Sequence, residues 1–142
     1  NDVISMKFTE EGKPSTDTEN YDPATVVAPM IQPLLSRRWD DLMKGDTIKV
    51  RYLAIERLET IGFKFFKDQE RNYKGRAVVD VVMKPSSFFI AALVRPVRIT
   101  LLKDAPHWIV ETDGRTPLRV PKRQPPQKRG DWKAIDARVE YE

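Results

Sequence analysis

The 142-residue chain contains no cysteine, and its six glycines stand apart from one another. Without cysteine the chain has no disulfide, thiolate nucleophile or cysteine-based metal centre, and scattered glycines form no phosphate-binding loop. Long apolar runs are also missing, since none approaches the roughly 20 residues that a transmembrane helix needs. We therefore expect no membrane-spanning segment, whereas a thiol-free chain is compatible with both the cytosol and the periplasm.

Histidine is nearly absent as well, since His107 is the only one. It lies at the start of a predicted strand, where a structural or surface role is far commoner than membership of a Ser/His/Asp triad. Neighbouring acids are typical of solvated faces, and no ligand spacing accompanies the pairs Asp40 with Asp41 and Glu56 with Glu59. We expect no catalytic residue, no metal site, no cofactor and no enzymatic activity.

The composition fits one domain over residues 1–142, with 40% hydrophobic and 32% charged residues. This ratio indicates a thin core and a large solvated surface, which a single curved sheet provides. We divide the domain into an acidic strand and loop (1–20), a helical segment (21–45) and an antiparallel sheet (46–142), which carries a basic, proline-rich loop at 121–130. The first residue is Asn rather than Met, which indicates a processed or trimmed chain.

The net charge of +4 is unevenly distributed along the chain. Residues 1–22 contain six acids and two bases, whereas residues 115–133 contain seven bases and one acid. Attraction between the two ends, or toward a neighbouring copy, is the simpler explanation. The alternative is a polyanion site in which lysine and arginine neutralise phosphates and Trp132 stacks on a base, although no nucleic-acid-binding motif accompanies it.

The first 45 residues predict one strand and two helices. Val3–Phe8 alternates between apolar and polar residues, which predicts a strand with one buried face formed by Ile4, Met6 and Phe8. Glu10–Asn20 is polar and predicts a loop without a fixed shape. Asp22 and Pro23 are typical of a helix start, and prolines then interrupt the segment, so we expect helices over Ala24–Ala28 and Pro33–Met43.

From residue 46 onward the alternation of apolar and polar residues has the period of a β-strand. It predicts five strands: Thr47–Glu56, Thr60–Gln69, Ala77–Met83, Val97–Leu102 and Trp132–Tyr141. Arg71–Arg76 supplies a turn between the second and third of them. Phe88–Val94 is a short apolar run, and its preceding serines and two alanines favour a helix over a strand. We expect this helix to be buried.

Asp113-Gly114 predicts a tight hairpin turn, because such a turn needs positive φ angles that these residues tolerate. Its two strands are expected at His107–Thr112 and Arg115–Val120. Pro117 cannot donate to a neighbouring strand, so it places the second of these at a sheet edge or a bulge.

Several of these features together resemble a known family. They are Tyr21-Asp22-Pro23 before a helix, a run of strands, the pattern Trp108-x-x-x-x-Asp113-Gly114-Arg115-x-Pro117-x-Arg119, and a last alternating strand. Over roughly Tyr21 to Tyr141 the chain resembles the C-terminal half of a Gram-negative envelope family named domain of unknown function 3108. Members of that family are similar in fold to the LolA and LolB lipoprotein carriers.

The resemblance implies an α+β, mostly β fold: a strongly curved antiparallel sheet, or half-barrel, of six to eight strands with one or two helices on its concave side. It also implies a periplasmic or cell-envelope location. The N-terminal hairpins that complete the half-barrel in the family have no counterpart before Val3. We expect either the second half of a longer protein or an open edge covered by another copy, as in a homodimer.

The resemblance further implies a carrier of an amphipathic, lipid-like ligand, or a scaffold for a partner. The aromatic residues of such a sheet form plain core, or they line a cavity for an acyl chain, with about 0.8 kcal/mol per buried methylene. The residues predicted to contact the chain are Tyr52, Phe63, Phe65, Phe88, Phe89, Ile90, Leu93 and Trp108. Those predicted near an anionic head group are Arg95, Arg98 and Arg119. The alternatives are nucleic-acid binding through the basic C-terminal segment and a purely structural interaction role.

Overall fold

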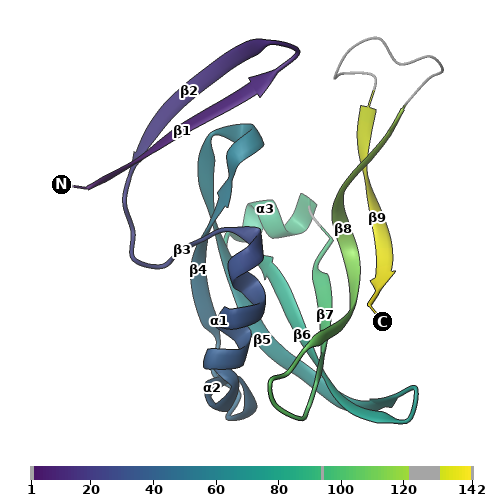
Figure 1. Ribbon diagram of the computed structural model, residues 1–142. Coiled ribbons are helices and arrows are strands. Elements are labelled where there is room, and N and C mark those ends of the chain that lie inside the picture. Colours follow the sequence, from purple (N-terminus) through teal and green to yellow (C-terminus); the bar gives the residue numbers. More distant parts are fainter. Residues whose placement is uncertain (1, 94, 122–131, 142) are drawn as a thin grey trace.

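A computed structural model describes residues 2–93, 95–121 and 132–141 (Figure 1). Its main feature is a seven-stranded sheet in the order β3-β4-β5-β6-β7-β8-β9, curled into a half-barrel. The short β3 pairs parallel with β4, and every other neighbouring pair is antiparallel. The predicted fold class, mostly β with a strongly curved sheet, is therefore confirmed.

The strands of this sheet follow the alternating segments of the sequence. They are β3 (Thr25–Val26), β4 (Ile48–Ala54), β5 (Glu59–Tyr73), β6 (Arg76–Pro85), β7 (Val97–Leu102), β8 (Ile109–Pro121) and β9 (Trp132–Glu140). The predicted strands of the meander are confirmed, although β5 extends further than the alternation indicated. The β5 to β6 turn is shorter than predicted, because Lys74 and Gly75 alone form it, both at positive φ.

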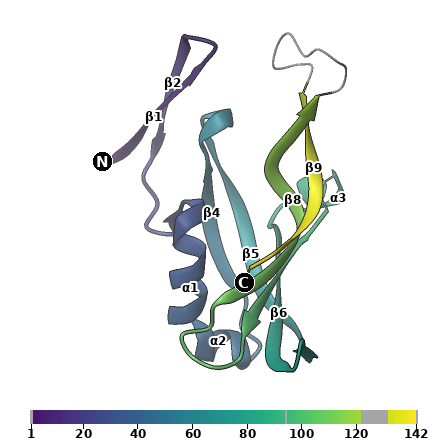
Figure 2. The same cartoon turned by 45° about the vertical axis from the view of Figure 1, so that its right-hand side comes forward.

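Two helices lie on the concave side of the sheet (Figure 1, Figure 2), namely α1 (Ile31–Arg37) and α2 (Trp39–Met43). The sequence predicted one continuous helix here, but the chain turns at Arg38, whose ψ of 19° interrupts the helical geometry. Because the axis changes direction there, both short helices place apolar side chains on the sheet.

The helix predicted at Ala24–Ala28 is wrong. The segment instead contains β3 and a short 3-10 helix, η1 (Ala28–Met30). Thr25 and Val26 are β-branched and pair with Arg51 and Tyr52 of β4, so pairing with the sheet edge prevails over the helix-start signal.

The N-terminal residues form a separate hairpin of β1 (Val3–Glu10) and β2 (Lys13–Asn20). The predicted strand is confirmed, with Met6 buried on its apolar face. The loop predicted over Glu10–Asn20 is wrong, because β2 pairs with β1 along its whole length. Glu11 and Gly12 both have positive φ and make the two-residue turn that fixes this register. Backbone pairing, rather than buried side chains, therefore defines β2.

The hairpin predicted around Asp113-Gly114 is also wrong. β8 continues straight through these residues, and β7 and β9 pair with it on either side. Gly114 serves close packing instead of a turn: a Cβ there would lie 3.0 Å from the Cα of Val97. The basic loop predicted at 121–130 falls almost wholly outside the described residues.

The core lies between the two helices and the concave face of the sheet. Leu35, Leu42 and Phe65 are fully buried in it. The other buried members, from the helices and from strands β3 to β7, are Val26, Leu34, Trp39, Ile48, Val50, Val79, Val81, Met83, Ile99 and Leu101. These residues occupy alternate positions in their strands, so the opposite, convex face is free to carry polar groups.

A third helix, α3 (Phe88–Leu93), connects β6 to β7. The predicted helix is therefore confirmed. Its predicted burial is wrong, because Phe88 and Phe89 are 82% and 81% exposed. The two views place α3 on the other side of the sheet from α1 (Figure 1, Figure 2), and no residue of α3 belongs to the described core.

Candidate functional site

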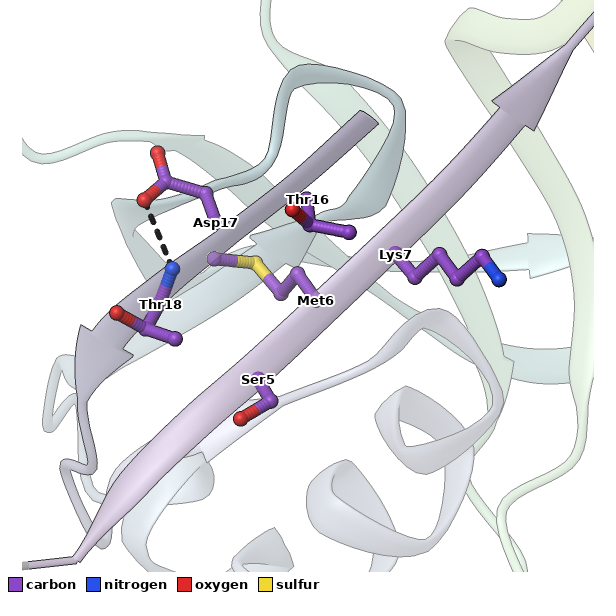
Figure 3. Close-up of a pocket in the computed structure, with 6 residues that line it drawn as sticks. All are labelled: Ser5, Met6, Lys7, Thr16, Asp17 and Thr18. Carbon is purple, nitrogen blue, oxygen red and sulfur yellow. Dashed lines mark hydrogen bonds between the residues drawn. The ribbon is translucent and has the colours of Figure 1, made fainter. Parts of the chain in front are cut away.

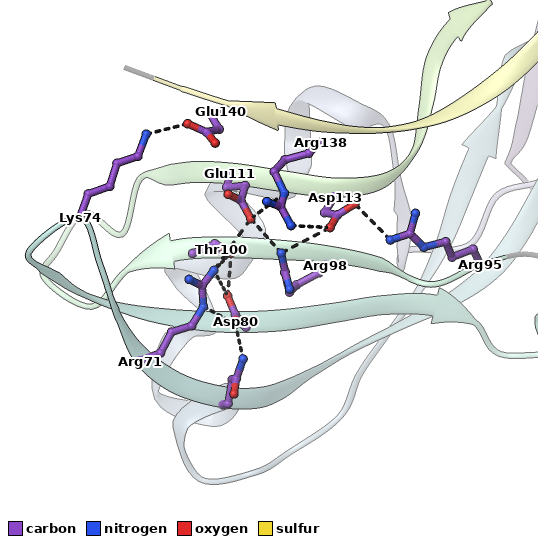
Figure 4. Close-up of polar contacts among 11 residues, drawn as sticks. Arg71, Lys74, Asp80, Arg95, Arg98, Thr100, Glu111, Asp113, Arg138 and Glu140 are labelled. Atoms are coloured by element: carbon purple, nitrogen blue, oxygen red, sulfur yellow. Dashed lines mark hydrogen bonds and ion pairs between the residues drawn. The ribbon is translucent and has the colours of Figure 1, made fainter.

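The convex face of the sheet carries a network of buried and half-buried charges (Figure 4). Asp80, Thr100 and Glu111 are at most 2% exposed, although all three are polar. They lie opposite one another on β6, β7 and β8, so the sheet register brings them to one face. A buried carboxylate is costly unless it is paired and hydrogen-bonded, so its partners matter.

Asp80 is fully supplied with donors. Arg71 Nε donates to its Oδ2 at 2.7 Å, Gln69 Nε2 donates to the same oxygen at 2.8 Å, and Thr100 Oγ1 donates to Oδ1 at 2.6 Å. Burial opposes ionisation of this carboxyl, but the hydrogen bonds from Arg71, Thr100 and Gln69 outweigh burial and hold the pKa of Asp80 below its ordinary value. The side chain is therefore an anion that links three strands.

The second half of the network surrounds Glu111 and Asp113. Arg98 Nη2 donates to Glu111 Oε1 at 2.9 Å and lies 3.4 Å from Asp113 Oδ2. Arg95 and Arg138 also pair with Asp113, at 3.2 and 3.4 Å. The arginines and the acids thus neutralise each other across β7, β8 and β9, as Figure 4 shows.

The ion pairs of this network occupy two of the arginines that were predicted to contact an anionic head group. Arg95 and Arg98 are already engaged by acids of the same face, so an anionic ligand would have to compete with Asp113 and Glu111. The side chain of Arg119 lies outside the described part of the chain. The network is best explained as a cross-link between strands rather than as an anion site.

A row of three lysines lies on the same convex face but differs from the network. Lys49, Lys64 and Lys84 are direct neighbours on β4, β5 and β6. Like charges directly opposite each other destabilise a sheet. Among the described residues, no acid lies within 4.0 Å of any of the three ammonium groups.

The α3 helix exposes a pair of aromatic rings beside this face. Phe88 and Phe89 contact each other edge to face, with ring centroids 6.1 Å apart, and Ile90 is 40% exposed. Together they form an apolar projection from the convex side. Large exposed apolar side chains that cluster in this way are typical of binding surfaces.

The residues predicted to line an acyl-chain cavity are divided between two environments. Phe65 is fully buried under the helices, and Tyr52 and Phe63 pack edge to face beside it at 5.7 Å. Phe88, Phe89 and Ile90 lie on α3 outside the core, as does Trp108, which is 58% exposed in the β7 to β8 connection. The side chain of Leu93 is outside the described part of the chain. The structure therefore does not bring these residues to one place.

His107 joins the β7 to β8 connection to the helices. Its ring stacks on Trp39 with centroids 3.7 Å apart and an interplanar angle of 9°. Gln32 Nε2 donates to its carbonyl oxygen at 2.8 Å, and Ser36 Oγ donates to the carbonyl of Pro106 at 2.7 Å. These contacts give His107 a packing role in holding α1 to the sheet.

The N-terminal hairpin carries a shallow depression of about 310 Å³, shown in Figure 3. It is lined by Ser5, Met6, Lys7, Thr16, Asp17 and Thr18. Lys7 pairs in register with Thr16, and Asp17 with Met6, so the two charged side chains lie on opposite faces of the hairpin. Asp17 accepts a hydrogen bond from the amide of the next residue, Thr18, at 2.8 Å, which is a local contact within β2 rather than a ligand site.

A second depression, of about 590 Å³, lies where the hairpin meets the sheet. Its polar groups are already bonded to one another: Glu19 Oε2 accepts from Thr60 Oγ1 at 2.5 Å, and Arg51 Nη2 donates to the carbonyl of Thr60 at 2.8 Å. This cluster attaches β2 to the start of β5.

The described residues contain no group of three or more histidine and acidic side chains arranged to hold a metal ion. Within residues 2–93, 95–121 and 132–141, no helix combines the length and apolarity needed to cross a bilayer.

Comparison with known proteins found no matching family model, no matching curated protein and no matching solved structure. The resemblance to the envelope family, and the location that it implies, therefore stay predictions.

Two features of the site were missed by reasoning from the sequence. Lys49, Lys64 and Lys84 each occupy the polar position of an alternating strand, but only the strand register makes them neighbours. The sequence predicts a turn at Asp113, whereas in the structure this side chain pairs with three arginines. The excess of arginine and lysine over acid in β4 to β7 was the one available signal.

Proposed function

We propose that this protein is a non-enzymatic binding protein that contacts amphipathic, lipid-like ligands through the aromatic surface of α3. The observation that supports this most strongly is the exposure of Phe88 and Phe89, at 82% and 81%. An isolated exposed aromatic ring needs no explanation, but two adjacent rings followed by Ile90 form an apolar projection that water solvates poorly. Burial of such rings in an apolar phase supplies about 1.5–3 kcal/mol each.

The packing of the concave side favours this surface over an internal cavity. Leu35, Leu42 and Phe65 are each 0% exposed, so the helices and the sheet already fill the space between them. An acyl chain on that side would have to displace α1 and α2, at the cost of the contacts that hold the core together. Contact through α3 requires no such rearrangement.

The test is binding to phosphatidylcholine vesicles, measured by co-sedimentation of the full chain. Replacement of both rings, Phe88→Ser with Phe89→Ser, is expected to lower the partition coefficient at least about 100-fold, because two apolar side chains no longer leave water. Trp108→Ser is the matched control, since Trp108 is also an exposed aromatic residue but lies in the β7 to β8 connection. That control is expected to bind as the unmodified protein does.

Two outcomes would overturn the assignment of this surface. Equal binding by the α3 double variant and the unmodified protein would show that the rings do not enter the lipid. Self-association of the unmodified protein without lipid, abolished by the same double variant, would show that a second copy covers the rings instead. Sedimentation velocity distinguishes this second outcome from lipid contact.

A further inference from the structure

We infer that Lys49, Lys64 and Lys84 form a contact surface for the anionic head groups of a lipid membrane, with the α3 rings inserted beside them. This inference rests on the proposed lipid contact of α3 and adds the charge of the lipid to it. The occupant is a membrane surface rather than a single small molecule, because three separated ammonium groups meet several head groups at once.

The first argument is the register of the sheet. Lys49 is opposite Lys64, and Lys64 is opposite Lys84, so three positive charges follow one line across three strands. Neighbouring strands are about 4.8 Å apart, and like charges at that separation repel each other. A negative surface beside the row removes this repulsion, which gives the row an electrostatic preference for an anionic partner.

The second argument is the contrast with the rest of the convex face. Arg71, Arg98 and Arg138 are each within 4.0 Å of an acid from a neighbouring strand. The lysine row has no such partner among the described residues. These three arginines are therefore neutralised by acids of the same face, whereas no ion pair within the described part of the chain neutralises the three lysines.

The third argument is the position of the row next to the apolar projection. Lys84 is the penultimate residue of β6, and α3 begins four residues later on the convex side (Figure 2). The ammonium group of Lys84 lies over the Phe66 ring, 5.3 Å from its centre, and this cation-π contact holds the charge on the convex face. Aromatic rings that enter a bilayer, flanked by lysines at head-group level, are a recurrent chemistry of interfacial membrane contact.

The chemistry of lysine favours head groups over a single tightly held phosphate. An ammonium group is a compact, well-hydrated point charge, whereas planar bidentate recognition of phosphate uses arginine. Each lysine near an anionic membrane contributes an affinity gain of about fivefold. The row is therefore expected to raise affinity for anionic over neutral vesicles by about 100-fold in total, and salt is expected to reduce this gain.

The experiment compares vesicles of phosphatidylcholine alone with an equimolar mixture of phosphatidylcholine and phosphatidylglycerol. The test variant carries Lys49→Gln, Lys64→Gln and Lys84→Gln. The control variant changes net charge equally, through Lys7→Gln, Lys13→Gln and Lys44→Gln, all at exposed positions outside the main sheet. We expect the test variant to lose about 100-fold in partition into the anionic mixture and to bind neutral vesicles unchanged, while the control loses less than about threefold.

The other outcomes separate the two proposals. Equal losses in the test and control variants would show a net-charge effect and overturn the role of the row, while α3 contact with neutral vesicles would stand. If no form binds vesicles, including the unmodified protein, the proposed lipid contact of α3 and the role of the lysine row are both wrong. Tight, lysine-dependent binding of a single-stranded oligonucleotide that is unaffected by Phe88→Ser with Phe89→Ser would overturn the membrane surface in favour of nucleic acid.

Discussion

The two faces of the seven-stranded sheet bury their side chains by different means. On the concave face, apolar side chains such as Phe65 of β5 form one core cluster with helix residues such as Leu35 of α1, and loss of contact with water stabilises them. On the convex face, Asp80 and Glu111 are equally buried, but arginines and hydroxyls compensate for their lost hydration. The comparison shows that apolar packing stabilises the concave face, whereas ion pairs and hydrogen bonds stabilise the buried groups of the convex face.

The largest expected loss of stability comes from removing a buried apolar side chain on the concave side of the sheet. Leu35→Ala removes most of a fully buried side chain between helix and sheet, and we expect it to lower the free energy of unfolding by about 3–4 kcal/mol. Phe88→Ala removes a larger but exposed side chain, and the expected change is within about 0.5 kcal/mol. Urea unfolding followed by circular dichroism measures both. A loss of similar size in the two variants would show that α3 is part of the core.

The next largest loss of stability comes from removing one partner of the ion pair between Arg71 and Asp80 on the convex face. Arg71→Met leaves Asp80 buried with only Gln69 and Thr100 as donors, and we expect a loss of about 2 kcal/mol in urea unfolding. The double change Arg71→Met with Asp80→Leu replaces the pair by apolar groups beside Val78 and is expected to recover most of that loss. If the double variant is less stable than Arg71→Met alone, the ion pair stabilises the fold more than apolar side chains in the same positions do.

A smaller effect tests the continuity of β8. Gly114 has φ of 146°, and an added Cβ would lie 3.0 Å from the Cα of Val97 and 3.1 Å from the carbonyl oxygen of Pro96. We expect Gly114→Ala to cost about 1–2 kcal/mol in urea unfolding, because the two strands must separate slightly. Separation of the strands is also expected to speed hydrogen exchange of the β7 amides. If residues 113 and 114 formed a hairpin turn at the surface instead, alanine there would not contact β7, and exchange in β7 would be unchanged.

The smallest effect concerns pH and contrasts a buried with an exposed acid. Because the pKa of Asp80 is lower in the folded than in the unfolded chain, its stabilising contribution is present above about pH 4 and is lost as pH falls through the folded value. Asp80→Asn is therefore expected to flatten the decline of stability below pH 4. Glu140→Gln is the comparison: Lys74 also lowers the pKa of Glu140, but solvent screens that pair, and little change is expected. If both variants flatten the decline of stability below pH 4 to the same extent, the expected difference between the buried and the exposed acid is wrong.

The sequence predicts most of this sheet because β4 to β7 bury one face, and burial of one face imposes alternation on the residues. It does not predict β2, where every residue from Lys13 to Thr18 is exposed and only backbone pairing defines the strand. Nor does it predict the path through Asp113-Gly114, because this dipeptide suits a tight turn as well as it suits an ion-paired acid beside a closely packed glycine.

The candidate site was predictable only in part. The sequence names the rings of α3 as candidate ligand contacts, and that role stays a prediction. Their apolar character also indicates burial, which is wrong, because the sequence does not record which side of the sheet α3 occupies. The lysine row depends on register between three strands, which a pattern within each strand does not contain.

Site-specific labelling in the presence of vesicles tests most directly whether the convex face, and not the concave one, meets lipid. The cysteine-free chain allows one cysteine at a time, at exposed Ala92 of α3 or at exposed Asp40 of α2, each carrying an environment-sensitive fluorophore. On addition of anionic vesicles, we predict a blue shift and protection from an aqueous quencher at position 92, with no change at position 40. A blue shift at position 40 alone, or at neither position, would contradict the claim that lipid contacts the convex face and not the concave face.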